Sequence, residues 1–588
     1  MTARLLVAGG ILAAAAAPFL ASDQYVLHVL IMWGIYGVLT LGLNVINGFA
    51  GQLSLGQGAF YGLGAYGAAV LTVTAGWFFW LAAPAATALA ALVGMLVALP
   101  VLRVRGIYLG MATFGFAEIV HVVLRSWESV TKGVLGIAGI LPPIALGIDF
   151  GRQDRFYYLV LAAVLLSVLL SHRIHQSSVG PALLAIRDDE LAAGLLGIHT
   201  TAHKVAAFGV AAGLAGLAGS LFAHYLTYIS PENFTSVESI LIVTMLIVGG
   251  RGNTLGAVVG AGLLVALPEM LRVVNVYRLL IYGLLLMGAA VFRPDGVVGS
   301  LGRGRRRARP VAAPLPGPAE TEAGPPLLRI EDLRVRFGGL VALEDVSFSV
   351  ARGEVYGIIG PNGAGKTTLF NAITGVAPVA RGRLRLGDQD LAGLAPYRRA
   401  RAGIARTFQN IRAFAGMRAW ETVEVGFHAR LRRGPLAHLC ETPGARREAG
   451  AVRSQADALL RFVGLEDLSE QLARNLPYGH QRRLEIARAL ATGPRLLLLD
   501  EPAAGMNESE CEELIALIRR IRDQGVTILL VEHHMQVVMA VCDRILVLNF
   551  GRAIAEGTPA AVRDDPAVNA AYLGTEVRDA TAGAPGRA

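Results

Sequence analysis

The first 300 residues are a succession of apolar segments, and this pattern limits the fold more than any other feature of the chain. A bilayer crossing needs about 20 apolar residues of helix, because backbone polar groups in lipid must be bonded within the segment. We therefore predict an all-α polytopic membrane domain over residues 1–300, with about ten spans. The expected spans lie near residues 5–21, 25–48, 59–75, 79–102, 107–126, 156–172, 205–228, 237–250, 254–268 and 279–293.

The N-terminus allows two interpretations. Arg4, the apolar residues 5–20 and then Ala21 and Ser22 resemble a secretory signal peptide. A first membrane helix is the alternative, and we favour it because many further spans follow.

The distribution of charge gives an orientation. Hydrophobic residues make up 54% of the chain and charged residues 16%, which is typical of a membrane protein. The net charge of +9 does not indicate nucleic acid, because basic residues gather at the cytoplasmic flanks of spans. The predicted spans place Arg103, Arg105, loop 173–204 and the basic run 303–309 on one side. We expect that side, with the N-terminus, to face the cytoplasm, and the three cysteines of the polar half to be reduced there.

The polar half has a different pattern. Residues 301–325 are rich in Arg, Pro, Ala and Gly and are predicted to be a linker. Residues 326–576 alternate strand-like runs with helical stretches, which predicts a mostly parallel α/β domain. The expected strands include residues 328–337, 342–350, 355–359, 496–499, 526–531 and 545–547. Residues 577–588 are expected to be a disordered tail.

A glycine-rich loop follows the strand at residues 355–359. It matches the phosphate-loop pattern G-x-x-x-x-G-K-[ST], whose backbone N–H groups converge on nucleotide phosphates. The lysine can reach the terminal phosphates, and the first threonine hydroxyl can bind Mg²⁺. We therefore predict a P-loop NTPase that binds ATP with Mg²⁺ through Gly360, Pro361, Asn362, Gly363, Ala364, Gly365, Lys366, Thr367 and Thr368.

Two carboxylates end a buried strand at residues 496–499. An acid at the carboxyl end of a parallel strand beside a phosphate loop can hold Mg²⁺, and Asp500 suits that role. Glu501 is then placed to orient or deprotonate the attacking water. The alternative is that both carboxylates cap the next helix.

Residues 476–490 place a glycine turn before an amphipathic helix, whose N-terminus offers free N–H groups to an anion. This stretch resembles the signature of the ATP-binding cassette (ABC) superfamily, and residues 326–576 resemble a complete ABC ATPase. The resemblance implies contacts of Tyr478, Gly479 and Gln481 with nucleotide. It also implies that Phe337 stacks on adenine, that Gln409 links Mg²⁺ and water to the membrane domain, and that His533 contacts the γ-phosphate.

Two positions depart from the superfamily pattern. Pro477 stands where the signature usually has serine, which removes a hydroxyl contact to a partner's nucleotide and leaves hydrolysis at that composite site open. Asn507 replaces the usual aspartate of the following loop. In this superfamily two cassettes enclose ATP head to tail, so a second cassette must come from another chain or from a second copy of this one.

The apolar half resembles the permease subunits of branched-chain amino-acid importers. The resemblance rests on four stretches, residues 41–60, residues 102–108 with 115–118, residues 186–190 and residues 293–296, and residues 570–574 resemble the ATPases of that system. It implies an ATP-driven importer subunit that combines permease and ATPase in one chain. The implied partners are a second permease, a second ABC ATPase and an extracytoplasmic solute-binding protein. Alternatives are an importer of urea, amides or other small solutes, a homodimeric exporter, and an ATP-gated channel or sensor.

Two further features concern the membrane half. Residues 182–197 can form a short helix, and Glu190 with the following Ala192, Ala193 and Gly197 resembles the loop by which importer permeases dock on the cassette. A solvated amphipathic helix is the alternative. Glu118 and His121 share one helical face within a span, either as functional residues or as an internal structural pair.

Overall fold

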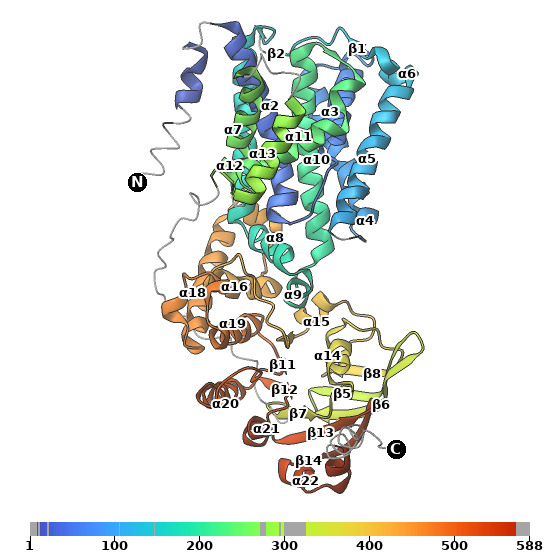
Figure 1. The fold of residues 1–588 in the computed structure, drawn as a ribbon, viewed down its shortest axis with the longest axis vertical. Helices are drawn as coiled ribbons and strands as arrows, with labels where there is room; N and C mark the ends of the chain where they lie inside the picture. Colours follow the sequence, from blue (N-terminus) through green and yellow to red (C-terminus); the bar gives the residue numbers. More distant parts are fainter. Residues whose placement is uncertain are drawn as a thin grey trace, which may run out of the picture. The chain divides into compact units, whose positions relative to one another are not determined.

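A computed structural model describes residues 9, 12–19, 23–104, 106–145, 147–270, 278–292, 296–298 and 325–571 (Figure 1). The described chain forms two compact units. The first contains the described residues up to 183 and from 201 to 298, and the second contains residues 184–200 and 325–571. Most of the predicted linker and the whole predicted tail lie outside the described residues.

The first unit is built from long apolar helices. Six of its segments are long and apolar enough to cross a membrane: Gln24–Phe49, Phe79–Val101, Ile107–Ser126, Gln153–Gln176, Thr200–Leu226 and Pro231–Gly249. The principal helices are α2 (Gln24–Leu43), α3 (Gln57–Val73), α4 (Phe79–Val101), α5 (Ile107–Ser126), α7 (Gln153–Gln176), α10 (Thr200–Leu226), α11 (Ser236–Gly249), α12 (Thr254–Met270) and α13 (Arg278–Phe292). The predicted all-α membrane fold is confirmed. Of the first predicted span, only residues 9 and 12–19 are described, and these are helical.

Small residues allow these helices to approach closely. A Cβ atom added at Gly64 of α3 would lie 2.3 Å from the Cα of Gly216 in α10, so the two backbones are in contact. The glycine-rich stretch 41–60 includes a π-helical turn, Asn44–Phe49, that continues α2. Within it the Asn44 side chain accepts a hydrogen bond from the Gly252 N–H at 2.8 Å. Gly64 and Gly216 therefore serve helix packing.

The second unit contains two sheets. The larger has the order β10-β11-β12-β7-β13-β14, and all its neighbouring strands are parallel except β13 and β14. The strands are β7 (Val355–Ile359), β10 (Ile404–Arg406), β11 (Leu496–Asp500), β12 (Thr527–Val531), β13 (Arg544–Asn549) and β14 (Arg552–Gly557). The smaller sheet is antiparallel, with β6 (Leu340–Val350), β5 (Leu328–Phe337), β8 (Arg381–Leu386) and β9 (Gln389–Asp390) in that order. The predicted α/β fold is confirmed.

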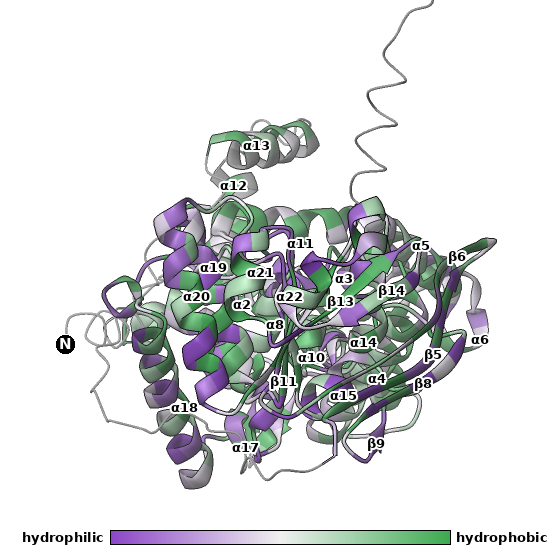
Figure 2. Ribbon diagram, turned by 90° about the horizontal axis from the view of Figure 1, so that it is seen from below, coloured by the Kyte–Doolittle hydropathy of each residue, from purple (hydrophilic) through white to green (hydrophobic). Residues whose placement is uncertain are grey.

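The other principal elements described in the second unit are helices. They are α14 (Lys366–Thr374), α15 (Pro396–Arg401), α16 (Ala419–Gly426), α17 (Pro435–Leu439), α18 (Pro443–Phe462), α19 (Tyr478–Ala491), α20 (Glu508–Asp523), α21 (Met535–Val541) and α22 (Pro559–Arg563). Figure 2 shows hydrophilic residues recurring along α18, whose apolar side buries Leu459 and Leu460 in the core. The strands β7, β11 and β12 are buried along their whole length, which is why their sequences are continuous apolar runs.

Residues 184–200 belong to the second unit, although the chain on either side of them belongs to the first. The prediction of one helix over residues 182–197 is wrong, because the segment contains two helices, α8 (Val179–Asp188) and α9 (Glu190–Leu195). Asp189 separates them. Its backbone is extended, and its side chain accepts a hydrogen bond from the Ala192 N–H at 2.8 Å, so it caps α9.

Candidate nucleotide-binding site

The phosphate loop connects the central strand β7 to helix α14, and its glycines are required by close contacts. Gly360 has φ 153°, and a Cβ there would lie 2.1 Å from the Leu548 carbonyl oxygen of β13. Gly365 has φ 101°, and a Cβ there would lie 2.7 Å from the Leu343 side chain. At Gly363 the corresponding position is open, with no heavy atom within 4 Å. The backbone at Gly363 is therefore uncovered, as binding of a phosphate by backbone N–H groups requires.

Lys366 is buried at the start of α14. Its Nζ donates to the carbonyl oxygens of Gly360 at 2.6 Å and Pro361 at 3.0 Å, so the side chain folds back over the loop. Burial lowers the pKa of this ammonium group, and the Glu501 and Asp500 carboxylates oppose the shift. Thr367, the next residue, is exposed.

Asp500 ends β11 and is only 1% exposed. Its Oδ2 accepts a hydrogen bond from Arg406 Nη2 at 2.8 Å, while its Oδ1 is buried and has no partner among the described residues. Burial raises the pKa of the Asp500 carboxyl, and the Arg406 guanidinium opposes that shift. A buried carboxylate oxygen with a free lone pair fits a hard cation such as Mg²⁺, and the exposed Thr367 hydroxyl is the same class of ligand. The residues present therefore fit the metal.

The side chains of Gln409 and His533 both contact Glu501, and the three residues come from three separate loops. Glu501 Oε2 accepts a hydrogen bond from Gln409 Nε2 at 2.9 Å, and its Oε1 lies 2.9 Å from His533 Nε2. Gln409 follows β10, Glu501 follows β11 and His533 follows β12, so neighbouring parallel strands deliver all three to one edge of the sheet. Glu501 has φ 47°, a left-handed conformation that is uncommon for a residue other than glycine and often marks a functional position. The three residues that the sequence predicts to be catalytic are thus in direct contact.

Two buried residues that the sequence analysis missed support this edge. Arg406, besides binding Asp500, donates from Nη1 to Asn371 Oδ1 at 2.6 Å. Glu532 is 1% exposed, and its carboxylate accepts from the Ala503 N–H at 2.6 Å and the His533 N–H at 3.0 Å. Burial raises the Glu532 pKa. A signal for Glu532 was present, because it directly follows a buried parallel strand, as Glu501 does.

The signature residues lie at the N-terminus of α19. Pro477 is the N-cap and provides no side-chain hydrogen bond. Tyr478 is 46% exposed, and Gln481 Nε2 donates to the Leu476 carbonyl at 2.8 Å. Gly479 is held closely, because a Cβ there would lie 2.6 Å from Glu510 Oε1. None of the hydrogen bonds found in the described residues joins these side chains to the phosphate loop.

The second departure from the superfamily pattern has a local structural role. Asn507 is the N-cap of α20, and its Oδ1 accepts from the Glu510 N–H at 2.9 Å. Glu510 Oε2 accepts from the Asn507 N–H at 3.0 Å, which completes a capping box. Asparagine caps a helix as well as aspartate does.

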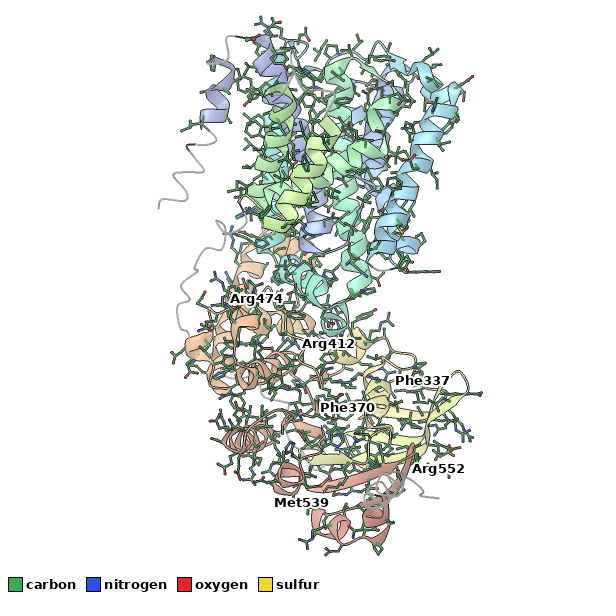
Figure 3. The ribbon with its side chains drawn as sticks, in the orientation of Figure 1. Phe337, Phe370, Arg412, Arg474, Met539 and Arg552 are labelled. Carbon is green, nitrogen blue, oxygen red and sulfur yellow. The ribbon has the colours of Figure 1, made fainter. Side chains whose placement is uncertain are left out.

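Phe337 lies on the hairpin between β5 and β6, with 47% of its surface exposed (Figure 3). Its hairpin neighbours Leu340 and Val341 are also exposed. An apolar ring that its own unit leaves half uncovered is available for stacking.

The segment 184–200 contacts the second unit through backbone and side-chain groups. Asp189 Oδ2 accepts from Arg412 Nη1 at 2.7 Å, and Asp188 Oδ2 accepts from the Gly416 N–H at 3.0 Å. Arg412 is labelled in Figure 3. The His199 ring lies 4.4 Å from the Tyr397 ring of α15. Sequence reasoning selected Glu190, and the two preceding aspartates also bond to the loop that follows Gln409.

Comparison with known proteins agrees with both halves. Residues 25–290 match the permease component of branched-chain amino acid transport systems, residues 343–504 match the ABC transporter family, and residues 554–578 match branched-chain amino acid ATP-binding cassette transporters. The ATP-binding protein BraF of Pseudomonas aeruginosa, named for high-affinity branched-chain amino acid transport, is 46% identical over 250 residues, which is 42% of this chain and 98% of BraF. The permease protein LivM of Salmonella typhimurium is 37% identical over 308 residues, covering 48% of this chain and 72% of LivM. A crystal structure of a nucleotide-free ATP-binding cassette from an ABC transporter is 33% identical in sequence. The match covers 42% of this chain and 98% of the crystallised chain, with a TM-score of 0.38.

These matches account for the two units. The permease match and the long apolar helices make the chain a multi-pass membrane protein. The cassette match makes it a nucleotide-binding ATPase whose hydrolysis is coupled to transport, within an assembly that includes partner subunits. The chain belongs to the branched-chain amino acid family of ABC transporters, and it carries the permease and the ATP-binding cassette of that family in one polypeptide.

Proposed function

We propose that this chain imports branched-chain amino acids across a bacterial inner membrane, driven by ATP hydrolysis in its own cassette. The observation that carries the proposal is the contact of Gln409, Glu501 and His533 at one sheet edge, beside an open phosphate loop, in a chain whose other unit spans a membrane. The substrate class follows the names of the relatives that match each half.

The phosphate loop, residues 360–368, binds the ATP phosphates through backbone N–H groups. Lys366 exchanges its two hydrogen bonds to loop carbonyls for hydrogen bonds to phosphate oxygens. Burial removes water from the ammonium group, so a negative phosphate stabilises its charge. The exposed Phe337 ring stacks on the adenine.

Thr367, Gln409 and Asp500 would hold Mg²⁺, and Asp500 would contribute its unpaired Oδ1. Bound Mg²⁺ would neutralise charge on the phosphate oxygens. Glu501 accepts a proton from the attacking water, and Gln409 and His533 fix the position of its two carboxylate oxygens. The left-handed backbone at Glu501 holds the carboxylate in this cluster.

Tyr478, Gly479 and Gln481 serve the nucleotide of a second cassette. They share the N-terminus of α19, where the N-cap residue makes no side-chain hydrogen bond to the backbone N–H groups. A second permease and a second ATPase, or a second copy of this chain, complete the transporter, and a solute-binding protein delivers substrate from outside. The N-terminus and the cassette are cytoplasmic, as the distribution of basic residues supports.

Nucleotide-driven motion reaches the membrane helices through residues 184–200. This segment is held to the loop after Gln409 by Asp188 and Asp189, and it continues directly into the membrane helix α10.

The test is uptake of labelled leucine, urea or an amide into proteoliposomes containing the chain and its partner subunits, with and without the solute-binding protein. We expect leucine uptake that requires both ATP and the binding protein. Uptake of urea or amides alone would contradict the substrate, and ATP-dependent export would contradict the direction. ATP binding without flux of any solute would contradict transport.

A further inference from the structure

Helix α19 carries three charged residues that are almost completely buried. Arg482, Glu485 and Arg488 have 1%, 3% and 2% of their surfaces exposed. Glu485 pairs with both arginines, at 3.5 Å to Arg482 Nη1 and 3.2 Å to Arg488 Nη2. Burial raises the Glu485 pKa and lowers the Arg488 pKa, which shows the cost of keeping these charges out of water. We call these residues the triad.

Every member of the triad also bonds to the backbone of residues 408–412. Arg482 donates to the carbonyl oxygens of Phe408 and Gln409, and Arg488 Nη1 donates to the Arg412 carbonyl oxygen at 2.6 Å. Glu485 Oε1 accepts from the Phe408 N–H at 3.2 Å. Bonds between charged groups and backbone are stronger and more directional than neutral ones. The triad therefore fixes this strand-to-loop segment to α19.

The triad and residues 408–412 together connect the signature end of α19 to residues 184–200. At one end, Arg482 Nη2 donates to the Tyr478 hydroxyl at 3.1 Å, in the first turn of α19. At residues 184–200, the Arg412 side chain donates a hydrogen bond to Asp189 at 2.7 Å. Arg412 also lies over the Phe408 ring at 4.9 Å, so both ends of the segment are braced.

We propose that the triad is a positioning device that transmits movement of the signature end of α19 to residues 184–200 through residues 408–412. This inference rests on the proposed function, and it assigns to the triad a role separate from that of Gln409. Stability alone does not account for the triad, because apolar residues of similar volume often replace buried ion pairs at no cost in stability. A rigid connection between two moving parts requires directional bonds, which apolar packing does not provide.

The test replaces Arg488 by lysine in the full chain with its partner subunits. Lysine keeps the positive charge beside Glu485 but cannot bond two acceptors in the fixed geometry of a guanidinium. Arg483→Lys is the matched control, because Arg483 lies on the same helix but pairs with Glu513 at 3.2 Å, away from residues 408–412. A second variant, Arg412→Gln, removes the ion pair between Arg412 and Asp189. The Arg412 side chain is 40% exposed, so this variant should fold even if Arg488→Lys does not.

Two readouts are needed. The first is hydrogen exchange of residues 184–200 with and without ATP, which requires no transport substrate. We expect wild type and Arg483→Lys to respond to ATP, and Arg488→Lys and Arg412→Gln to lose that response. The second is the amount of solute transported per ATP hydrolysed. We expect this ratio to fall about fivefold or more in Arg488→Lys and Arg412→Gln, which corresponds to the lower end of ordinary coupling free energies. Both variants should retain basal ATPase activity.

The double variant should be no worse than either single variant, because both break one connection. A wild-type exchange response in Arg488→Lys and Arg412→Gln would overturn the proposal. Failure of the wild type to transport leucine while its exchange response depends on the triad would contradict only the proposed substrate, so the two failures are distinguishable.

Discussion

Replacing Arg406 by methionine tests whether the pairing of Asp500 holds this edge of the cassette together. The two side chains are 4% and 2% exposed and lie 2.8 Å apart. Arg406 also bonds to Asn371, and its guanidinium lies 5.5 Å from the ring centres of Phe370 and Phe408. Methionine retains the packing of the chain but leaves the Asp500 carboxylate buried without a counter-charge.

The expected loss is large because the burial is nearly complete. Removing one partner of a buried ion pair costs about 3–5 kcal/mol, and a domain of this size loses about 2–4 °C per kcal/mol, which gives a fall of about 6–20 °C in the cassette midpoint. Arg446→Met is the matched control, because its pair with Glu441 at 3.1 Å leaves 66% of the arginine side chain exposed. A surface pair contributes less than about 1 kcal/mol, so the control should lose less than about 4 °C.

A thiol-reactive fluorescent maleimide reports cassette unfolding specifically. All three cysteines of the chain, Cys440, Cys511 and Cys542, lie in the cassette, and the last two are buried. Heating should therefore expose two thiols as the cassette melts. Adding Asp500→Asn to Arg406→Met should recover most of the loss, because no unpaired charge remains. If Arg406→Met melts within the range of the Arg446→Met control, the reasoning about this ion pair is wrong.

Three further predictions concern catalysis, thiol chemistry and coupling. Glu501→Gln should retain ATP binding and lower phosphate release by about 10²–10⁴-fold, because the amide keeps the shape but cannot accept the proton; turnover close to wild type in a phosphate-release assay would contradict this. In the folded chain only Cys440 should react with iodoacetamide at pH 8, since burial raises the pKa of the Cys511 thiol and raises that of Cys542 to about 12. Mass spectrometry should find one label per native chain and three after denaturation, and labelling of Cys542 in the native protein would refute the assignment. Asp188→Asn combined with Asp189→Asn should preserve nucleotide binding but reduce solute transported per ATP, while undiminished coupling would exclude a docking role for these residues.

The sequence predicted features that are local or strongly periodic. The apolar runs at β7, β11 and β12 were identified because they are buried along their whole length, and α2, α4 and α5 because they are long and apolar. Fixed motif spacing also selected Gln409, Glu501 and His533, which the structure brings together. Their contact follows from strand order, which spacing alone does not give.

Partnerships between distant residues could not be predicted. Arg406 and Asp500 are 94 positions apart, and no pattern near either residue indicates which buried charge will meet which. The triad was missed for a similar reason, because Arg482 and Arg488 look like the solvated face of an amphipathic helix until the loop they hold is placed. The break between α8 and α9 did have a local signal, since Asp189 is a favourable N-cap.

The central claim is that ATP held by this cassette moves solute through the helices of the same chain. The most direct test is ATP-dependent leucine uptake by proteoliposomes that contain the Lys366→Ala chain, its partner subunits and the solute-binding protein. The account predicts uptake at the level of liposomes without ATP, because the loop loses the ammonium group that bonds to its carbonyl oxygens. Uptake equal to that of the wild-type chain would contradict it.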